Sequence, residues 1–257
     1  MMHYRRALAA LILITSCLVA PVSAVAQPPS AEEVLRRAER SMFPDSFVMR
    51  ATLRTLESGT EASSMQMDIS YKRDVGSRIE ILSPARSRGI RLLQREGALW
   101  LFNPMAGTGQ PIRLSPKAAF QGSVFSNRDV GDPQYSVQYE VTEADQEVLD
   151  HPQLGQVPVL VLVAAARGPD AAYSRVKLFV RASDYLLLKG EYYAKSGLLF
   201  KRQLFTDIRE LAGRQRPTTM RMVSLDQPNR ESVMSIESLQ EKPALPDSMF
   251  SLAALTR

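Results

Sequence analysis

The chain has 257 residues, of which 45% are hydrophobic, and it carries 32 basic against 27 acidic residues. This mild positive excess comes without a dense basic patch interleaved with aromatic residues, so the composition does not indicate a nucleic-acid-binding protein. No internal repeat, low-complexity linker or shift in composition divides the sequence, which favours one domain.

The N-terminal residues have the pattern of a secretory signal peptide. A short cationic stretch, MMHYRR, precedes the apolar run ALAALILITSCLVAPV, which is too short for a stable membrane span. Small residues offer cleavage after Ala24 or Ala26, and we favour Ala26. We therefore expect a signal peptide at residues 1–26, a single domain at residues 27–257 and a periplasmic location.

The sole cysteine, Cys17, lies inside this leader. The stretch ITSC loosely fits a lipidation motif, which leaves open a lipoprotein anchored at Cys17, although the apolar run continues past the cysteine. Cleavage after Ala26 leaves a mature chain of 30 basic against 27 acidic residues and no thiol. Such a chain has no disulfide, thiolate metal site or cysteine nucleophile.

The residues after Ser30 predict one helix. Ser30 is a candidate N-cap, and Glu33 lies three residues on, where it would complete a capping box. The sequence FPD ends the helix after residue 42. One face carries the apolar residues Val34, Leu35, Ala38 and Met42. Because the other face is strongly charged, we expect the helix to lie on another element.

Most of the remaining sequence alternates with period two. In SMQMDISYK, the residues Met65, Met67, Ile69 and Tyr71 share one face. The same pattern occurs in FVMRATLRTL, SRIEILS, GIRLLQ, ALWLFN, YSVQYEV, VPVLVLVAA, YSRVKLFVRA, YLLLKGEYYA, LLFKRQLFTDI, TTMRMVSL and ESVMSIESLQ. Short connections between these segments favour antiparallel hairpins. A sheet of about a dozen strands should curl into a barrel or half-barrel with room for a ligand. The final residues, PDSMFSLAALTR, predict a short helix or turn that docks Phe250 and Leu252.

One segment fits neither a helix nor a strand. KAAFQGSVFSNRDV, residues 117–130, is too apolar for a solvent loop, too short for a good helix and insufficiently alternating for a strand. Two interpretations remain open: a lid over an apolar concavity, or a loop packed on the edge of the sheet.

Motifs of known catalytic sites are missing from the sequence. It contains no G-x-S-x-G, H-E-x-x-H, P-loop or G-x-G-x-x-G pattern. His151 is the only histidine after the leader, and LDHPQLG predicts a solvated histidine in a turn. The acidic pairs Glu32/Glu33 and Glu143/Asp145 are expected on a solvated helix and a polar turn. We therefore expect no catalytic residue, no metal and no cofactor.

The apolar residues of the predicted strands and of the unassigned segment are the candidates for binding. We expect a ligand cavity lined by Met65, Met67, Ile69, Tyr71, Ile81, Leu92, Trp100, Phe102, Phe120 and Phe125. Methionine side chains adapt to irregular apolar partners, although for any single residue a filled core is the simpler interpretation.

Arginines supply two further candidates. The strip Arg86, Arg88, Arg91 and Arg95 predicts a solvated strand face, or else a site that steers anionic head groups. Arg73 ends a strand, where an arginine is usually exposed. At the mouth of a barrel, its fork of donors would suit the backbone carbonyls of a lid.

The stretch DISYKRDVGSRIEILSPARSRGIRLLQREGALWLFNP, followed by FQGSVFSNRDV, resembles the LolA-like family of periplasmic outer-membrane lipoprotein-sorting proteins. The similarity runs from about Ala31 to Leu255, with GALWLFNP and the GSxFSxxD pattern at Gly122–Asp129 as its more specific motifs. The family often has an acid where this chain has Val124, which makes a polar role for that position doubtful.

The resemblance implies a mainly β (α+β) fold: an incomplete antiparallel β-barrel of about 11 strands with helices covering its concave face. It also implies an apolar interior for acyl chains, a lid that includes the residues from Phe120 to Val130, and Arg73 as the latch of this lid.

The function expected on this basis is a monomeric periplasmic carrier that shuttles acyl chains of lipoproteins or lipids towards the outer membrane. An inner-membrane exporter and an outer-membrane acceptor are the expected partners. The alternative is a non-catalytic sensor or regulatory module of the same fold that binds lipid or lipoprotein and signals to a membrane partner. A hydrolase is disfavoured because no catalytic histidine is apparent.

Overall fold

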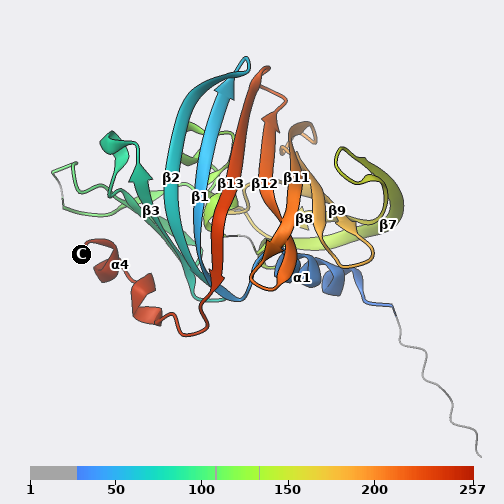
Figure 1. Ribbon diagram of the computed structural model, residues 1–257, viewed down its shortest axis with the longest axis horizontal. Coiled ribbons are helices and arrows are strands. Elements are labelled where there is room, and N and C mark those ends of the chain that lie inside the picture. Colours follow the sequence, from blue (N-terminus) through green and yellow to red (C-terminus); the bar gives the residue numbers. More distant parts are fainter. Residues whose placement is uncertain (1–27, 108, 133) are drawn as a thin grey trace, which may run out of the picture.

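The computed structural model describes residues 28–107, 109–132 and 134–257, so the expected signal peptide and Cys17 lie outside the described residues. One antiparallel sheet of 13 strands forms the protein, where about 11 strands were expected (Figure 1). The strand order is β6-β5-β4-β3-β2-β1-β13-β12-β11-β10-β9-β8-β7, and the sheet is not closed. The expectation of an incomplete antiparallel barrel is therefore confirmed.

The strands of the first half are β1 (Ser46–Glu57), β2 (Thr60–Lys72), β3 (Gly76–Ser83), β4 (Arg91–Arg95), β5 (Ala98–Phe102) and β6 (Ile112–Leu114). Those of the second half are β7 (Tyr139–His151), β8 (Gly155–Ala166), β9 (Arg175–Arg181), β10 (Leu187–Tyr193), β11 (Leu199–Leu211), β12 (Arg214–Ser224) and β13 (Arg230–Glu241). The helical pieces are α1 (Ala31–Met42), α2 (Asn127–Gly131), α3 (Tyr135–Gln138) and α4 (Leu252–Leu255), with 3-10 turns η1 (Ala85–Ser87), η2 (Phe120–Gly122) and η3 (Asp247–Phe250).

The strand order separates two elements that follow each other in the sequence. β1 pairs with β13 at the centre of the sheet, so that β6 and β7 form its two opposite edges. The connection between them, residues 115–132 and 134–138, therefore runs from one edge to the other. We call it the cover segment, because it packs on the inner face of the sheet; in Figure 1 it lies behind the central strands.

Helix α1 follows the sequence prediction, with one difference. The Ser30 side chain accepts a hydrogen bond from the backbone N–H of Glu33, and the apolar face of the helix is buried. The Glu33 carboxylate, however, accepts from Arg36 and Arg37 instead of completing a capping box. At the other end, the buried Arg216 guanidinium donates to the Ser41 carbonyl at 2.6 Å, which satisfies an acceptor that the last turn leaves free.

The strand predictions fail at the edges of the sheet. Residues 135–138, expected as part of a strand, form α3. β7 continues to His151 through residues expected in turns, and β6 was not predicted. Both are edge strands with mostly exposed side chains, so the alternation that marks a half-buried strand does not develop in them.

A separate apolar cluster packs the C-terminal residues on the opposite face of β4 and β5. Phe250 and Leu255 are fully buried there, together with Leu93 and Phe102, whereas Leu252, which was expected to dock, is 43% exposed. The prediction for Leu252 is therefore wrong. Leu255, three residues later, occupies the buried position because α4 turns Leu252 outwards.

Arginines of β4 hold this terminal segment. Arg91 donates to the Leu255 carbonyl and Arg95 to the Phe250 carbonyl, each at 2.9 Å. The expectation of a solvated arginine strip is therefore wrong for Arg91, which is largely engaged with the C-terminal residues. The Arg95 side chain donates to a carbonyl of the same segment but is still 40% exposed.

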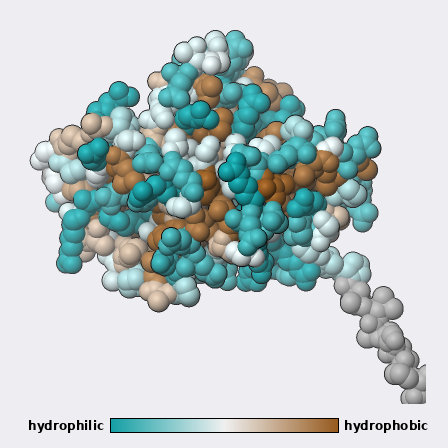
Figure 2. Space-filling model, viewed as in Figure 1, coloured by the Kyte–Doolittle hydropathy of each residue, from teal (hydrophilic) through white to brown (hydrophobic). Residues whose placement is uncertain are grey.

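The surface seen from the same direction is mainly hydrophilic, with hydrophobic residues gathered towards its centre (Figure 2). None of the helices in the described ranges has the length and hydrophobicity that spanning a bilayer requires.

The C-terminal cluster gives a first prediction. Phe250→Ala should lower the free energy of unfolding by about 3 kcal/mol, because it removes a fully buried ring. Leu252→Ala is the matched control and should change it by less than about 0.5 kcal/mol. Urea unfolding of both variants measures the difference, and equal effects would contradict the assigned roles.

Candidate functional site

The inner face of the sheet is apolar and rich in methionine. Of the 11 methionines in the sequence, seven pack in the main core beneath the cover segment and α1. Six lie on strands, namely Met49, Met65, Met67, Met220, Met222 and Met234, and the seventh, Met42, projects from α1 into the same core. Unbranched, polarizable methionine side chains change shape readily, so this lining can repack around different apolar partners.

Eight of the ten predicted lining residues lie together in this core. They are Met65, Met67, Ile69, Tyr71, Ile81, Leu92, Phe120 and Phe125; Met65 is partly buried and the others are buried. Trp100 and Phe102 instead belong to the C-terminal cluster on the other face of the sheet. Their neighbours Leu99 and Leu101 point into the main core, because alternation along a strand does not say which of two apolar faces is concave.

Other inward residues were not among the predicted site residues. Met220, Met222 and Met234 on β12 and β13, with Phe47 and Met49 on β1, complete the lining. Their strands were predicted from TTMRMVSL, ESVMSIESLQ and FVMRATLRTL, and the methionines at alternate positions were the available signal.

The cover segment presents its apolar residues to this lining. Phe120, Val124, Phe125 and Val130 are at most 8% exposed and pack in the main core. This placement agrees with the interpretation of residues 117–130 as a lid over the concave face and not as a loop at the edge of the sheet. The Val124 side chain is apolar and buried, so it has no polar role in this structure.

Polar groups on the strands hold the backbone of the cover segment. The Lys201 ammonium donates to the Val124 carbonyl at 2.6 Å, and Arg230 donates to the Gly122 carbonyl at 2.5 Å. The Ser232 hydroxyl accepts from the Val124 N–H at 3.0 Å. Burial lowers the pKa of Lys201, because the ammonium loses hydration, and its hydrogen bond to the Val124 carbonyl offsets part of this desolvation cost.

Arg73 does not form these bonds in the structure. Its guanidinium donates to Asp45 at 2.5 Å and lies 3.7 Å from Glu39, both of which belong to α1 or the turn after it. The expectation that Arg73 bonds directly to lid carbonyls is wrong, because these two carboxylates lie within its reach. A role as latch remains a prediction that would act through Glu39.

Glu39 connects α1 to the cover segment. Its carboxylate accepts from the backbone N–H of Ser136 at 2.5 Å and from the Ser136 hydroxyl at 2.9 Å. The side chain is 4% exposed, and burial raises its pKa above the ordinary value even though the hydrogen bonds from Ser136 oppose this. The Glu39 carboxylate is therefore a buried group under the cover segment, and the hydrogen bonds from Ser136 only partly offset the cost of burying its charge.

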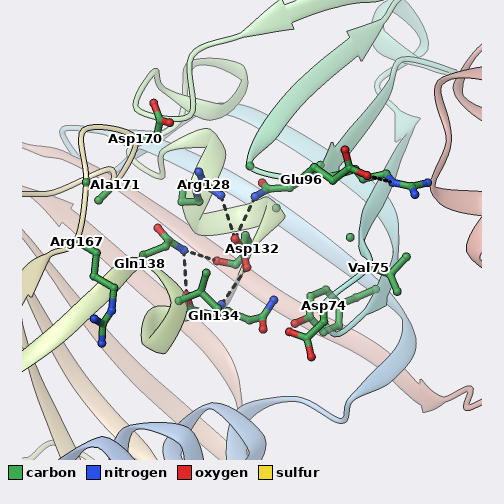
Figure 3. Close-up of a pocket in the computed structure, with 18 of the residues that line it drawn as sticks. Asp74, Val75, Glu96, Arg128, Asp132, Gln134, Gln138, Arg167, Asp170 and Ala171 are labelled. Atoms are coloured by element: carbon green, nitrogen blue, oxygen red, sulfur yellow. Dashed lines mark hydrogen bonds and ion pairs between the residues drawn. The ribbon is translucent and has the colours of Figure 1, made fainter.

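A polar cleft of about 480 Å³ opens at one end of the half-barrel, between the β2–β3 and β4–β5 turns and the cover segment (Figure 3). Arg128 of α2 donates to Asp132 at 3.0 Å, and the Gln94 amide nitrogen donates to the same carboxylate at 3.1 Å. Burial raises the pKa of Asp132, although Arg128 opposes the shift.

Two smaller cavities lie deeper in the molecule, of about 60 and 40 Å³. One shares Arg128, Asp132 and Gln138 with the cleft, and the other shares Tyr71 and Gly131 with it. Each has room for only a few water molecules. Neither cavity has room for a larger apolar molecule while the cover segment is in place.

His151 is not the solvated turn histidine that was expected. It is 1% exposed at the end of β7, and its Nε2 lies 2.9 Å from the carbonyl of Phe205. Nδ1 accepts from the Gln153 N–H, so Nε2 carries the proton and donates to this carbonyl. In the described ranges, no group of three or more His, Cys, Asp or Glu side chains is arranged to hold a metal ion.

A family model described as "Uncharacterized protein" matches residues 73–257. A solved structure of a LolA superfamily protein from Nitrosomonas europaea is similar to this chain, with 26% sequence identity and a TM-score of 0.78. The similarity covers 87% of this chain and 98% of that one. The chain belongs to the matched family, and it is LolA-like.

Two further solved structures share the LolA-like fold. A putative outer membrane lipoprotein-sorting protein domain from Vibrio parahaemolyticus is 17% identical, with a TM-score of 0.75 over 89% of this chain and 100% of that one. A DUF1329 family protein from Desulfovibrio piger is 20% identical, with a TM-score of 0.74 over 88% and 97% of the two chains. No curated protein matches the sequence. The resemblance expected from the sequence is confirmed.

The buried charge of Glu39 gives a second prediction. Its pKa is raised in the folded protein, so the unfolded carboxyl releases its proton first as the pH rises above the ordinary value of 4.5. The free energy of unfolding therefore falls as the pH rises from 4.5 to the higher pKa of the folded state. Glu39→Gln removes this pH-dependent loss, and its amide can still form hydrogen bonds with the backbone N–H and the hydroxyl of Ser136. We expect a melting temperature about 2–4 °C above wild type at neutral pH, the shift that ~1 kcal/mol gives in a chain of this size.

The difference in melting temperature between Glu39→Gln and the wild type should shrink below pH 4.5, because the Glu39 carboxyl is then protonated in both the folded and the unfolded state. Glu33→Gln is the control on the same helix, because Glu33 is solvated and its pKa is lowered by Arg37 and Arg36. It should not raise the melting temperature. A lower melting temperature for Glu39→Gln at neutral pH would mean that the attraction to Arg73 outweighs burial.

Proposed function

We propose that this LolA-like protein is a periplasmic carrier that binds acyl chains of lipids or lipoproteins between the concave face of its sheet and the cover segment. The observation that supports this most directly is the methionine-rich inner face covered by a segment with little regular structure. Such a lining adapts to chains of different length and shape.

The energetics of such a carrier require a displaceable cover. A buried methylene contributes ~0.8 kcal/mol, so an enclosed chain of about fourteen carbons gains on the order of 10 kcal/mol. A ligand held that firmly is difficult to deliver. Packing of the cover segment on the empty inner face competes with the ligand and reduces its net affinity.

The contacts of the cover segment suit repeated opening. When an acyl chain enters, the apolar residues of the cover segment can exchange their contacts with the inner face of the sheet for contacts with the acyl chain. Its backbone carbonyls at Gly122 and Val124 lie near the ends of β13 and β11, where Arg230 and Lys201 donate to them. A small number of such bonds sets the balance between the closed and the open form.

A crosslink across the cover tests the proposal. The backbone nitrogen of Val124 lies 3.0 Å from the Ser232 hydroxyl, so Val124→Cys and Ser232→Cys place two thiols close together in a Cys17→Ser background. Joining them with a disulfide or a short bifunctional reagent should abolish uptake of a fluorescent fatty acid, and reversing the link should restore it. Unchanged uptake by the locked protein would contradict a moving cover.

The lysine contact gives the next prediction. Lys201→Met removes the donor to the Val124 carbonyl and so destabilises the closed form. Apparent affinity for the same probe should rise about three- to tenfold, because less free energy is needed to displace the cover. Fluorescence titration measures this change.

Lys177→Met is the matched control, because Lys177 pairs with Glu147 on the strands β9 and β7 and lies away from the cover segment. Its affinity for the probe should equal that of the wild type. Weaker binding by Lys201→Met would mean that Lys201 contacts the ligand instead of holding the cover.

A further inference from the structure

Three residues that line the polar cleft each carry a buried polar atom that has no hydrogen-bond partner among the described residues. The atoms are the Tyr71 hydroxyl, the Gln94 Oε1 oxygen and the Arg128 Nε nitrogen. The three residues are 2%, 5% and 6% exposed. Two other atoms of this kind, on Arg91 and Arg230, lie outside the cleft, so three of five gather at one place. A buried polar group without a partner calls for an explanation, and a ligand is one.

The types of these atoms define a complementary chemistry. Arg128 Nε–H and the Tyr71 hydroxyl are two donors, and Gln94 Oε1 is one acceptor. A secondary amide offers two lone pairs on its carbonyl oxygen and one N–H donor, so it satisfies all three. An ester or a carboxylate offers acceptors only and leaves the Gln94 oxygen without a partner.

The orientation of the Gln94 amide follows from its neighbours. Its nitrogen donates to Asp132, and the reverse orientation would set the amide oxygen against this carboxylate. The oxygen is therefore the free atom. It rests against Gly131, where a Cβ atom would lie 2.9 Å from it. Glycine at this position leaves room beside the acceptor.

The three residues also lie where the cleft meets the deeper cavities. Arg128 lines the cleft and the 60 Å³ cavity, and Tyr71 lines the cleft and the 40 Å³ cavity. A ligand with an apolar tail in the interior and its polar end in the cleft would place the junction of the two parts beside this wall.

We propose that Tyr71, Gln94 and Arg128 form a subsite that recognises the amide of an N-acyl group, so that the protein prefers acyl chains linked through an amide to those linked through an ester. This inference rests on the proposed function and specifies the chemical class of the ligand that the carrier would bind.

Competition against a fluorescent fatty acid tests the subsite, with N-methylmyristamide and methyl myristate as matched competitors. The wild type should bind the amide about five- to tenfold more tightly, as expected for one added hydrogen bond to a buried acceptor. Gln94→Met should remove this preference while leaving ester binding unchanged. Gly131→Ala keeps the Gln94 side chain but presses a methyl group against its oxygen, and should also reduce the preference.

Tyr71→Phe gives a signature that a merely structural residue would not give. It should weaken both competitors a few-fold, because both contain a carbonyl, and at the same time raise the melting temperature of the ligand-free protein by removing an unpartnered hydroxyl. Tyr193→Phe is the control; its hydroxyl donates to Glu191 outside the cleft, and competitor binding should not change.

Equal binding of amide and ester by the wild type, or a preference that survives in Gln94→Met, would overturn the amide subsite and leave the carrier proposal standing. Failure of both competitors to displace the probe, or of the probe to bind, would contradict the carrier proposal itself and the subsite with it.

Discussion

The pairing of β1 with β13 is the constraint on which the rest of this structure depends. It joins the two halves of the chain at the centre of the sheet and moves β6 and β7, consecutive in sequence, to opposite edges. The chain between them must pass from one edge to the other, and it does so across the inner face. Because this face is apolar, the crossing segment gains free energy by packing on it, and the fold thereby supplies its own cover.

A cover that packs well also needs groups that limit how firmly it is held. Glu39 and Asp132 are carboxylates whose pKa values burial raises. Each forms hydrogen bonds to or within the cover segment, and each would regain hydration if that segment moved away. Buried charge thus favours opening while apolar contact favours closing, which is a suitable balance for a protein that must both take up and release a ligand.

Much of this architecture is predictable from the sequence, and the failures have physical causes. Alternation located the central strands because one face of each is buried, and it failed on β7, an edge strand with solvent on most of its residues. It placed Trp100 and Phe102 on the wrong face, since β5 is apolar on both sides. A cation that donates to backbone carbonyls of the cover segment was expected, with Arg73 as the candidate. Lys201 and Arg230 form these bonds instead. The sequence could not show this, because the strand order decides which cations lie next to the cover segment.

An experimental structure determined with an N-acyl ligand tests the central claim most directly. We expect the hydrocarbon chain to lie against the methionine-rich inner face, with the cover segment displaced from this face and the central strands unchanged. A chain bound elsewhere on the protein, with Phe120 and Phe125 still seated in the core, would contradict it.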